Sequence, residues 1–333
     1  MPANLTPQYL EAEQRYRSAK TPQEKLEALE LMLREIPKHK GTDKLQAELK
    51  RKISDQRKSS SEKSSKKTVS YSVDSHGNQQ VVVIGPPNSG KSKLVSQLTG
   101  TEMKVADYPF TTRMPQPAMM KYEDIVIQIV DTPAISEEHC DPWMGSIVRS
   151  ANAILLVADL TDDSIVKNLG FIFEFLEKQK IYLIEVNQEI NLAEDKRTDM
   201  DTFQNTLLVG NKKDVDVSEI VLELLQDEYK TAWHTFPVSS STGENLEALK
   251  HKIFETLDII RIIPKPPGKK PDFSSPIILR KGSSVWDLAD SIHHDLAQNL
   301  KSAKIWNCKD YLDGQRIPID YILSDRHIVE LEA

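Results

Sequence analysis

The 333-residue chain contains only two cysteines, Cys140 and Cys308, too few for a disulfide framework or a cysteine-rich zinc site. It also lacks an apolar run approaching the ~20 residues that a membrane helix needs. The N-terminal residues contain no basic cluster followed by an apolar stretch, so we expect no secretory signal peptide. These absences predict a cytoplasmic protein with no membrane partner.

Charge is unevenly distributed along the chain, which carries 43 Lys and Arg, 50 Asp and Glu, and a net charge of −7. The segment from Lys38 to Lys67 holds eleven basic and four acidic residues, so the remainder is more acidic than the total suggests. Such a segment is either a solvated helix and tail or a contact for an anionic partner such as RNA. The charge pattern by itself leaves both readings open.

The N-terminal part is predicted to be helical. Thr21-Pro22-Gln23-Glu24 combines an N-cap residue, a proline at the first helical position and a capping-box glutamate. Pro37 ends that helix, and a second one begins after Gly41. We therefore expect a basic helical hairpin over residues 1–58, followed by a Ser- and Lys-rich flexible linker over residues 59–78.

Short apolar runs alternate with helical patterns over residues 79–260. The runs that read as strands are Val81–Ile84, Ile125–Val130, Ile154–Ala158 and Leu207–Val209, with helices expected at Ser164–Lys178 and Glu244–Asp258. This alternation predicts an α/β domain with a mostly parallel sheet. The polar and acidic segment Glu185–Phe203 interrupts the pattern, and we interpret it as a surface insertion.

A cluster of prolines and a glycine over residues 264–271 marks a second boundary, and residues 261–333 form a smaller unit. Strands are expected at Pro276–Leu279, Ala303–Trp306 and His327–Leu331. Between the first two, one helix face is expected to carry Val285, Leu288, Ile292 and Leu296. The pattern predicts a small α+β domain.

The strongest motif fits G-x-x-x-x-G-K-[ST] and directly follows the strand that ends at Ile84. Its residues are Gly85, Pro86, Pro87, Asn88, Ser89, Gly90, Lys91 and Ser92. In such a P-loop, backbone N–H groups and the N-terminus of the next helix bind phosphates. Lys91 is expected to reach the β- and γ-phosphates, and Ser92 to place its hydroxyl on Mg²⁺.

A second motif, Asp131-Thr132-Pro133-Ala134, begins directly after the strand Ile125–Val130. An aspartate at the end of such a strand can hold Mg²⁺ or its water opposite the P-loop. Alone it would more readily be a helix cap. Its distance of forty residues from Lys91 favours the metal-binding interpretation.

A third motif, Asn211-Lys212-Lys213-Asp214, follows the strand Leu207–Val209. The Asp214 carboxylate can accept two hydrogen bonds from the edge of guanine, whereas adenine has no matching pair of donors there. After a P-loop, this pattern favours guanine over adenine. The weaker Val238-Ser239-Ser240 follows another strand, and its two serines could close over the base.

These motifs, in this order, resemble the guanine-nucleotide-binding domain of translation-type GTPases. The segment from Ala106 to Thr112, ADYPFTT, is similar to the first switch of the Obg family, and Ile36–Ile53 resembles the N-terminal segment of its developmentally regulated GTP-binding (DRG) subfamily. The C-terminal residues, from Lys265 to the end, look like a TGS domain, a β-grasp module. The resemblance implies a Ras-like P-loop GTPase core between the helical hairpin and that module.

By this resemblance the chain hydrolyses GTP to GDP with Mg²⁺ and acts as a molecular switch. Thr112 would join Ser92 and Asp131 at the metal and reach the γ-phosphate in the GTP-bound state. Lys91, Thr112, Asp131 and Asn88 would be the catalytic residues. The nucleotide-binding set would be the P-loop with Asp131, Thr132, Pro133, Ala134, Asn211, Lys212, Asp214, Ser239 and Ser240.

Two departures from the family pattern affect the expected rate of GTP hydrolysis. Ala134 stands where the family usually has glycine, and Ile135 stands where Ras-like enzymes carry a glutamine that orients water. An aliphatic side chain cannot orient water, so we expect slow intrinsic turnover. Asn88 suggests another source of catalysis, because an asparagine at this loop position helps related GTPases hold K⁺ beside the phosphates.

The resemblance also implies a partner, either the ribosome or another structured RNA, and we expect a monomer. Whether a protein regulator is required is left open. One alternative is a GTP-dependent interaction or sensing module with negligible hydrolysis, for which Ala134 and Ile135 argue. A P-loop ATPase or small-molecule kinase is a further alternative, and Asn211 and Asp214 argue against it.

Overall fold

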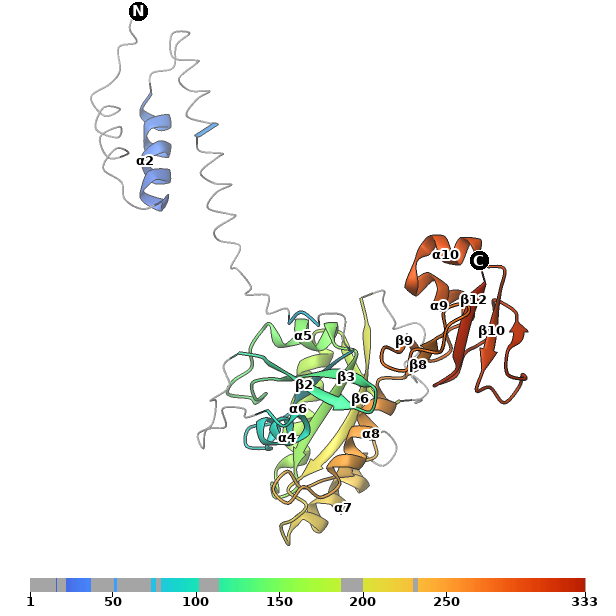
Figure 1. Ribbon diagram of the computed structural model, residues 1–333. Helices are drawn as coiled ribbons and strands as arrows, with labels where there is room; N and C mark the ends of the chain where they lie inside the picture. The colour runs from blue at the N-terminus through green and yellow to red at the C-terminus, as the bar shows by residue number, and fades with distance from the viewer. Residues whose placement is uncertain are drawn as a thin grey trace, which may run out of the picture. The chain divides into compact units, whose positions relative to one another are not determined.

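The computed structural model forms two compact units, residues 1–70 and 71–333 (Figure 1). It describes residues 16, 22–36, 51–52, 73–75, 79–101, 114–186, 200–229 and 233–332. In the first unit, helix α2 (Pro22–Glu35) begins at the proline that follows the predicted N-cap, which confirms that helix. The rest of the expected hairpin lies almost entirely outside the described residues. Among the described helices, none has both the length and the apolar character needed to span a membrane.

A seven-stranded sheet forms the centre of the second unit. Its strands are β1 (Gln79–Ile84), β2 (Gln116–Tyr122), β3 (Ile125–Asp131), β4 (Ala153–Asp159), β5 (Ile181–Ile184), β6 (Thr202–Asn211) and β7 (Phe236–Pro237). The order is β2-β3-β1-β4-β6-β5, with β7 also paired to β6. Among the strand pairs described in this sheet, β2–β3 alone is antiparallel. The predicted α/β architecture is confirmed, and the sheet brings the carboxyl ends of β1, β3, β4 and β6 to one edge.

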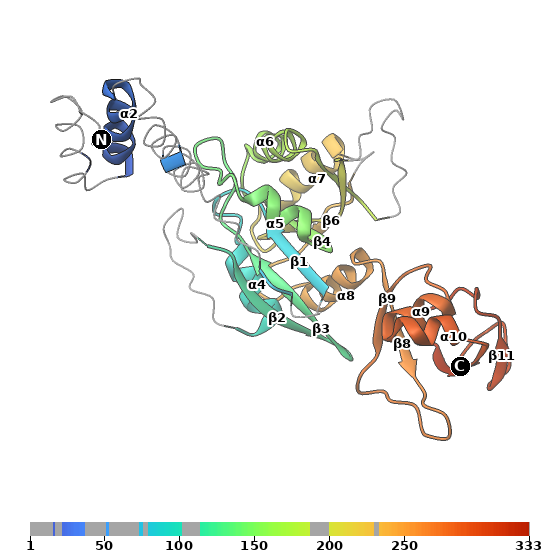
Figure 2. The same cartoon turned by 90° about the horizontal axis from the view of Figure 1, so that it is seen from above.

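Helices cover both faces of this sheet, as Figure 2 shows. They are α4 (Lys91–Thr99), α5 (Met144–Ser150), α6 (Ile165–Glu177), α7 (Ser218–Tyr229) and α8 (Leu246–Thr256). Alternation along β1 divides the core, because Val81 and Val83 pack with α4 and α8, whereas Val82 and Ile84 pack with α5, α6 and α7. Buried on both sides, the strands read as continuous apolar runs.

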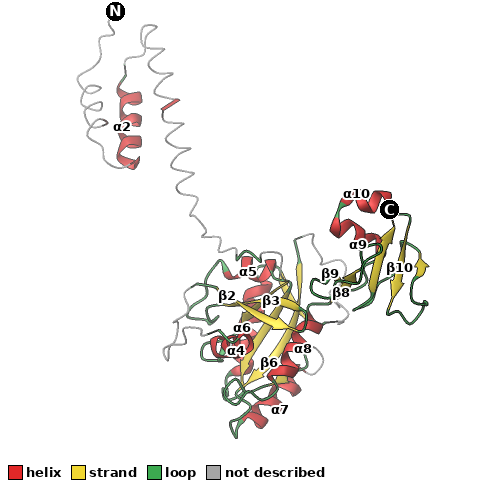
Figure 3. Ribbon diagram, viewed as in Figure 1, coloured by secondary structure: helices red, strands yellow, loops and turns green. Residues whose placement is uncertain are grey.

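The C-terminal domain is a second sheet with two short helices packed on it (Figure 3). Its elements are β8 (Ile259–Pro264), β9 (Ile277–Arg280), α9 (Val285–Ile292), α10 (His294–Asn299), β10 (Ser302–Trp306), β11 (Gln315–Ile317) and β12 (Ile328–Glu332). The strand order is β11-β10-β12-β8-β9. Ser284 caps α9 through a full capping box with Asp287, which explains why the helix starts at Val285.

Several expectations about this unit need correction. The boundary expected between residues 260 and 261 falls inside β8, which begins at Ile259 and pairs with β12. One helix face was expected to carry Val285, Leu288, Ile292 and Leu296, but α9 ends at Ile292, which is 48% exposed, and Leu296 lies in α10. Phe203, expected in a surface insertion, lies in β6. Residues 187–199 of that segment lie outside the described part of the chain.

The C-terminal end of the expected flexible linker contacts the sheet. Val73 packs against the apolar cluster shared by β1 and α6, and its carbonyl accepts a hydrogen bond from the side-chain amide of Gln80 at 3.0 Å. The Asp74 carbonyl accepts another from Gln128 at 3.0 Å. Residues 73–75 therefore belong with the domain that follows them, and not with the predicted linker.

Arg261, in β8, joins the C-terminal domain to the turn between β2 and β3. Its side chain is 4% exposed, and the guanidinium contacts Glu123 and Asp124 of that turn at 2.5 and 2.7 Å and pairs with Asp325 at 2.7 Å. It also lies over the ring of Phe254, 4.6 Å from the ring centre. One buried cation thus bridges carboxylates of both domains.

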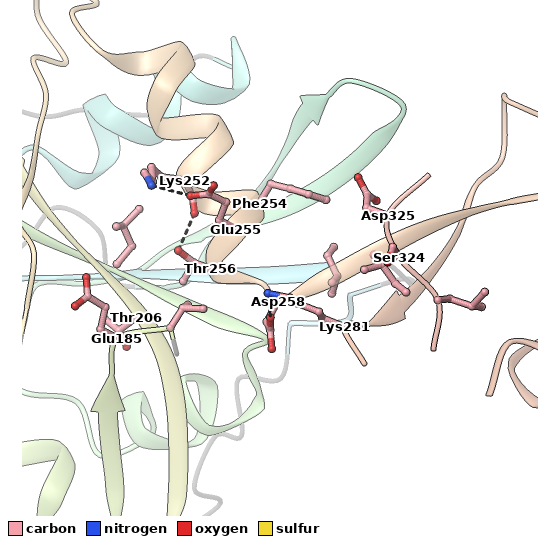
Figure 4. A pocket seen from close by; sticks show the side chains of 15 residues that line it. Glu185, Thr206, Lys252, Phe254, Glu255, Thr256, Asp258, Lys281, Ser324 and Asp325 are labelled. Atoms are coloured by element: carbon pink, nitrogen blue, oxygen red, sulfur yellow. Dashed lines mark hydrogen bonds and ion pairs between the residues drawn. The ribbon is translucent and has the colours of Figure 1, made fainter. Parts of the chain in front are cut away.

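A cleft of about 500 Å³ lies beside this junction, between β6, the end of α8 and the C-terminal domain (Figure 4). Asp258 and Lys281 form a long ion pair at 3.9 Å within its lining, and Asp325 also lines it. None of the motif residues identified from the sequence lines this cleft, so the candidate site lies elsewhere.

Replacing Arg261 with methionine should lower the free energy of unfolding by on the order of 2–4 kcal/mol, because three carboxylates lose their buried counter-ion. Urea denaturation followed by circular dichroism measures this. The matched control is Lys252→Met, which removes an exposed ion pair with Glu255 and should change stability by less than ~1 kcal/mol. Equal effects of the two substitutions would show that the Arg261 junction is not a stabilising contact.

Candidate functional site

The predicted P-loop lies between β1 and α4, at the carboxyl edge of the sheet. Gly85 and Gly90 both have positive φ angles, +155° and +82°, that other residues adopt only with strain. A Cβ atom on Gly85 would lie 2.3 Å from the Val157 carbonyl oxygen of β4. Both glycines are therefore required by backbone geometry and close packing.

Lys91, the first residue of α4, is only 7% exposed and folds back over this loop. Its ammonium donates to the carbonyl oxygens of Gly85 at 3.0 Å and Pro86 at 2.8 Å. Burial lowers the pKa of Lys91 to about 8, although nearby Asp131 opposes the shift. A buried ammonium held by neutral carbonyls is poised to bind an anion.

Asp131, the last residue of β3, is 1% exposed and faces Ser92 of α4. The Ser92 hydroxyl donates to its Oδ2 atom at 2.5 Å, while its Oδ1 atom is buried with no hydrogen-bond partner among the described residues. Burial raises the pKa of this carboxyl, against the effects of Ser92 and Lys91. A hydroxyl beside an unsatisfied carboxylate oxygen is a donor set that suits Mg²⁺. Among the described residues, no group of three or more His, Cys, Asp or Glu side chains lies close enough together to hold a metal ion.

Asn211, the last residue of β6, connects three loops through its fully buried side chain. Its amide nitrogen donates to the Ser89 carbonyl at 2.9 Å, and its amide oxygen accepts from the backbone of Ser240 at 3.0 Å. A Cβ atom on Gly90 would lie 2.3 Å from that amide nitrogen. The second glycine of the P-loop therefore makes room for the third motif.

Asp214 lies at the exposed end of the same loop and is oriented by Ser239. The buried Ser239 hydroxyl donates to Oδ1 of Asp214 at 2.5 Å and accepts from the backbone of Thr242 at 3.0 Å. The serine motif, weak in sequence, thus holds the predicted base-recognising carboxylate in place.

The segment after Asp131 packs close to the P-loop. The backbone N–H of Ile135 donates to the Gly85 carbonyl at 3.1 Å, and its side chain is 1% exposed in the core beside α5 and α6. The Thr132 hydroxyl donates to the Val83 carbonyl at 2.6 Å, beside Pro133 and the half-buried Ala134. Ile135 is therefore a core residue, as its aliphatic character would suggest.

Two predicted residues, Asn88 and Thr112, are not part of the contacts described above. Asn88 is exposed at the crest of the P-loop, with a left-handed backbone φ of +60°. Thr112 lies outside the described residues, as does the whole of the expected first switch from Ala106 to Thr112. Their predicted roles remain predictions.

Sequence reasoning missed Asp159, which ends β4 at the same edge. It is 6% exposed, and Lys212 donates to it at 2.5 Å. The signal that identified Asp131, an aspartate directly after a buried apolar run, applies equally to the run Ile154–Ala158. The carboxyl edge of the sheet therefore brings together the P-loop, the buried pair of Asp131 and Ser92, and the exposed carboxylate of Asp214, which Ser239 orients.

Comparisons with known proteins agree with this arrangement. Residues 80–189 match the family described as 50S ribosome-binding GTPase, and residues 260–332 match the TGS domain. A GTP-binding protein from Pyrococcus horikoshii OT3 shares the fold, with a TM-score of 0.51 at 16% identity, over 77% of this chain and 100% of that one.

Relatives extend along most of the chain. An uncharacterized GTP-binding protein of Methanocaldococcus jannaschii is 28% identical, over 93% of this chain and 92% of that protein. Developmentally-regulated G-protein 3 of Arabidopsis thaliana is 29% identical over 78% and 84%, and Ribosome-interacting GTPase 1 of Saccharomyces cerevisiae is 25% identical over 92% and 98%. The chain therefore contains a segment that matches the 50S ribosome-binding GTPase family and a C-terminal TGS domain, and over most of its length it is similar to proteins named developmentally regulated GTP-binding proteins.

Proposed function

We propose that the chain is a Mg²⁺-dependent switch that hydrolyses GTP slowly to GDP and phosphate and engages the ribosome or another structured RNA. The observation that carries the nucleotide site is the Asn211 side chain, which joins the P-loop to the loop that bears Asp214. Phosphate recognition and base recognition are thereby held at a fixed separation.

The phosphates would bind to the N-terminal end of α4 and to the backbone N–H groups of the loop. Lys91 would exchange its contacts with the loop carbonyls for the β- and γ-phosphates, which satisfy its charge better. Asp214 would accept two hydrogen bonds from the guanine edge, while Ser239 keeps it in position. Lys212 and Ser240 complete the surroundings of the base.

Ser92 and Asp131 would hold Mg²⁺, since the unsatisfied Oδ1 atom of Asp131 points to a missing partner. When bound, the metal supplies charge neutralisation for the phosphates. By family resemblance, Thr112 would close on the same region in the GTP-bound state. Loss of that contact after hydrolysis would release its segment and change the surface that a partner meets.

Hydrolysis should be slow because Ile135 points into the core and cannot orient water. The same observation supports a second candidate, a GTP-dependent interaction module without significant turnover. Measurement of phosphate release over many turnovers separates the two. Equal rates of GTP hydrolysis in K⁺ and in Na⁺ would contradict a role for Asn88 in holding a catalytic potassium ion.

The name of the yeast relative, Ribosome-interacting GTPase 1, motivates the ribosome as partner, and the basic segment Lys38–Lys67 independently suits an RNA surface. The direct test is co-sedimentation with ribosomes in the presence of a non-hydrolysable GTP analogue or GDP. We expect binding with the analogue and release with GDP. Absence of binding in both states would remove the ribosome from the proposal.

Gly90→Ala should lower GDP affinity on the order of 100-fold, equivalent to ~2.7 kcal/mol, because the new methyl group displaces the Asn211 amide. Gly100→Ala is the matched control. Gly100 also has a positive φ, at the other end of α4, but no atom lies within 4 Å of the place that its new methyl group would take. It should lose only a little stability and keep its affinity. Similar affinities for the two variants, measured by calorimetry, would contradict the role given to Asn211.

Nucleotide affinity should depend on pH through Lys91. Its pKa of about 8 in the free protein lies below its ordinary 10.5, and bound phosphate raises it again, so binding takes up a proton above pH 8. The affinity is then flat below about pH 8 and falls by up to ~tenfold per pH unit above it. Titration between about pH 7.5 and 9 tests this. A constant affinity across that range would mean that Lys91 stays charged.

A further inference from the structure

Asp159 is a buried carboxylate with both oxygens in use. Its Oδ1 atom accepts from the backbone N–H of Thr161 at 2.9 Å and from the Thr161 hydroxyl at 2.7 Å. Its Oδ2 atom accepts from the Lys212 ammonium at 2.5 Å. One oxygen is thus held by the turn that follows β4, and the other holds a side chain of the loop that recognises the base.

Lys212 has an unusual backbone conformation. Its φ of +67° lies in the left-handed region, which a lysine adopts only when its surroundings impose it. The residue stands between Asn211, which contacts the P-loop, and Asp214, which faces the base position. The direction of the chain at Lys212 therefore decides how those two side chains are placed relative to each other.

Backbone pairing holds Asp159 at a defined distance from this loop. Asp159 pairs with Asn211 in the register of β4 and β6, and the N–H of Leu160 donates to the Asn211 carbonyl at 3.0 Å. On the far side of the turn, the N–H of Lys213 donates to the Val238 carbonyl at 3.0 Å. These backbone contacts fix the main chain on either side of Lys212, but they do not fix the Lys212 side chain. That side chain is held by Asp159.

The ion pair between Asp159 and Lys212 is largely shielded from water. The Asp159 side chain is 8% exposed and that of Lys212 is 32% exposed, so water competes only weakly for the carboxylate. Removing the carboxylate's charge would leave the lysine free to turn toward solvent. The left-handed turn would then lose the side-chain contact that opposes its intrinsic strain.

We propose that Asp159 is a positioning residue for guanine recognition, which it serves by holding Lys212 and so the turn between Asn211 and Asp214. This inference rests on the proposed nucleotide-binding function. Asp159 acts through Lys212 and need not touch the nucleotide. The ligand class it serves is a guanine nucleoside di- or triphosphate.

The test compares the dissociation constants of GDP and of inosine diphosphate, which lacks only the exocyclic amino group that Asp214 would recognise. For the wild type we expect GDP to bind at least ~tenfold more tightly, the worth of one hydrogen bond to a charged group. In Asp159→Asn the ratio should fall to within ~threefold, because Asp214 is no longer aimed at the amino group. General weakening of the fold would lower both affinities and leave their ratio unchanged.

Glu330→Gln is the matched control, since Glu330 is an equally buried carboxylate, 8% exposed, that pairs with Lys265 and Lys304 in the C-terminal domain. It should leave the ratio at the wild-type value. Lys212→Arg, which keeps the charge, should retain most of the ratio, whereas Lys212→Met should lose it. When each is combined with Asp159→Asn, Lys212→Arg and Lys212→Met should give the same ratio of GDP to inosine diphosphate affinity, because the ion pair is already lost.

The outcomes separate the two claims. If the wild type binds no guanine nucleotide, the proposed function fails. If the wild type discriminates and Asp159→Asn keeps the same ratio, the positioning role is wrong while the proposed function stands. Should Asp159→Asn fail to fold, Thr161→Val still decides, because it removes the hydroxyl that holds the Asp159 carboxylate without touching a residue of the nucleotide site, and an unchanged ratio in that variant would overturn the inference.

Discussion

The contact on which the candidate site depends is the pair of hydrogen bonds made by the Asn211 side chain. It reaches from the end of β6 to the Ser89 carbonyl in the P-loop and to the backbone of Ser240. Only a glycine at position 90 leaves room for it. Three loops that are distant in sequence are thereby fixed to one another before any ligand binds, which lowers the ordering cost of binding.

Around that contact the protein buries charge that it does not fully satisfy. Burial pushes Lys91 and Asp131 toward their neutral forms, the first by lowering its pKa and the second by raising it. The Oδ1 atom of Asp131 has no partner among the described residues. A fold selected for stability alone would pair such groups or expose them to water. The buried, incompletely paired charges therefore indicate a site that a charged ligand completes.

Much of the fold could be predicted because the central strands are buried on both faces and read as apolar runs. The edge strands could not: buried and exposed positions alternate along β2, but its sequence QPAMMKY does not alternate apolar and polar residues, and β5 has only four residues, Ile181–Ile184. Strand β8 could not be recognised from the sequence, because it begins at Ile259, only two residues after helix α8 ends, and because it ends at a proline, Pro264. Local patterns do not show which sheet such a segment joins.

For the candidate site, sequence motifs identified residues but not the contacts between them. The P-loop, Asp131 and Asn211 were identifiable because each follows a buried strand at a typical spacing. The dependence of Gly90 on Asn211, and the pairing of Asp159 with Lys212, both require the register of neighbouring strands, which the sequence does not display. Ser239 was ambiguous for the same reason, since its partner Asp214 lies on another loop.

The most direct test of the account is nucleotide discrimination by the full chain in the presence of Mg²⁺. A fluorescent GDP analogue is bound, and GDP, GTP, ADP and ATP are compared as competitors. A site built around Asp214 and Asn211 predicts that guanine nucleotides displace the probe at concentrations at least ~1,000-fold lower than adenine nucleotides. Displacement by ADP or ATP at concentrations similar to those of GDP or GTP would contradict the account.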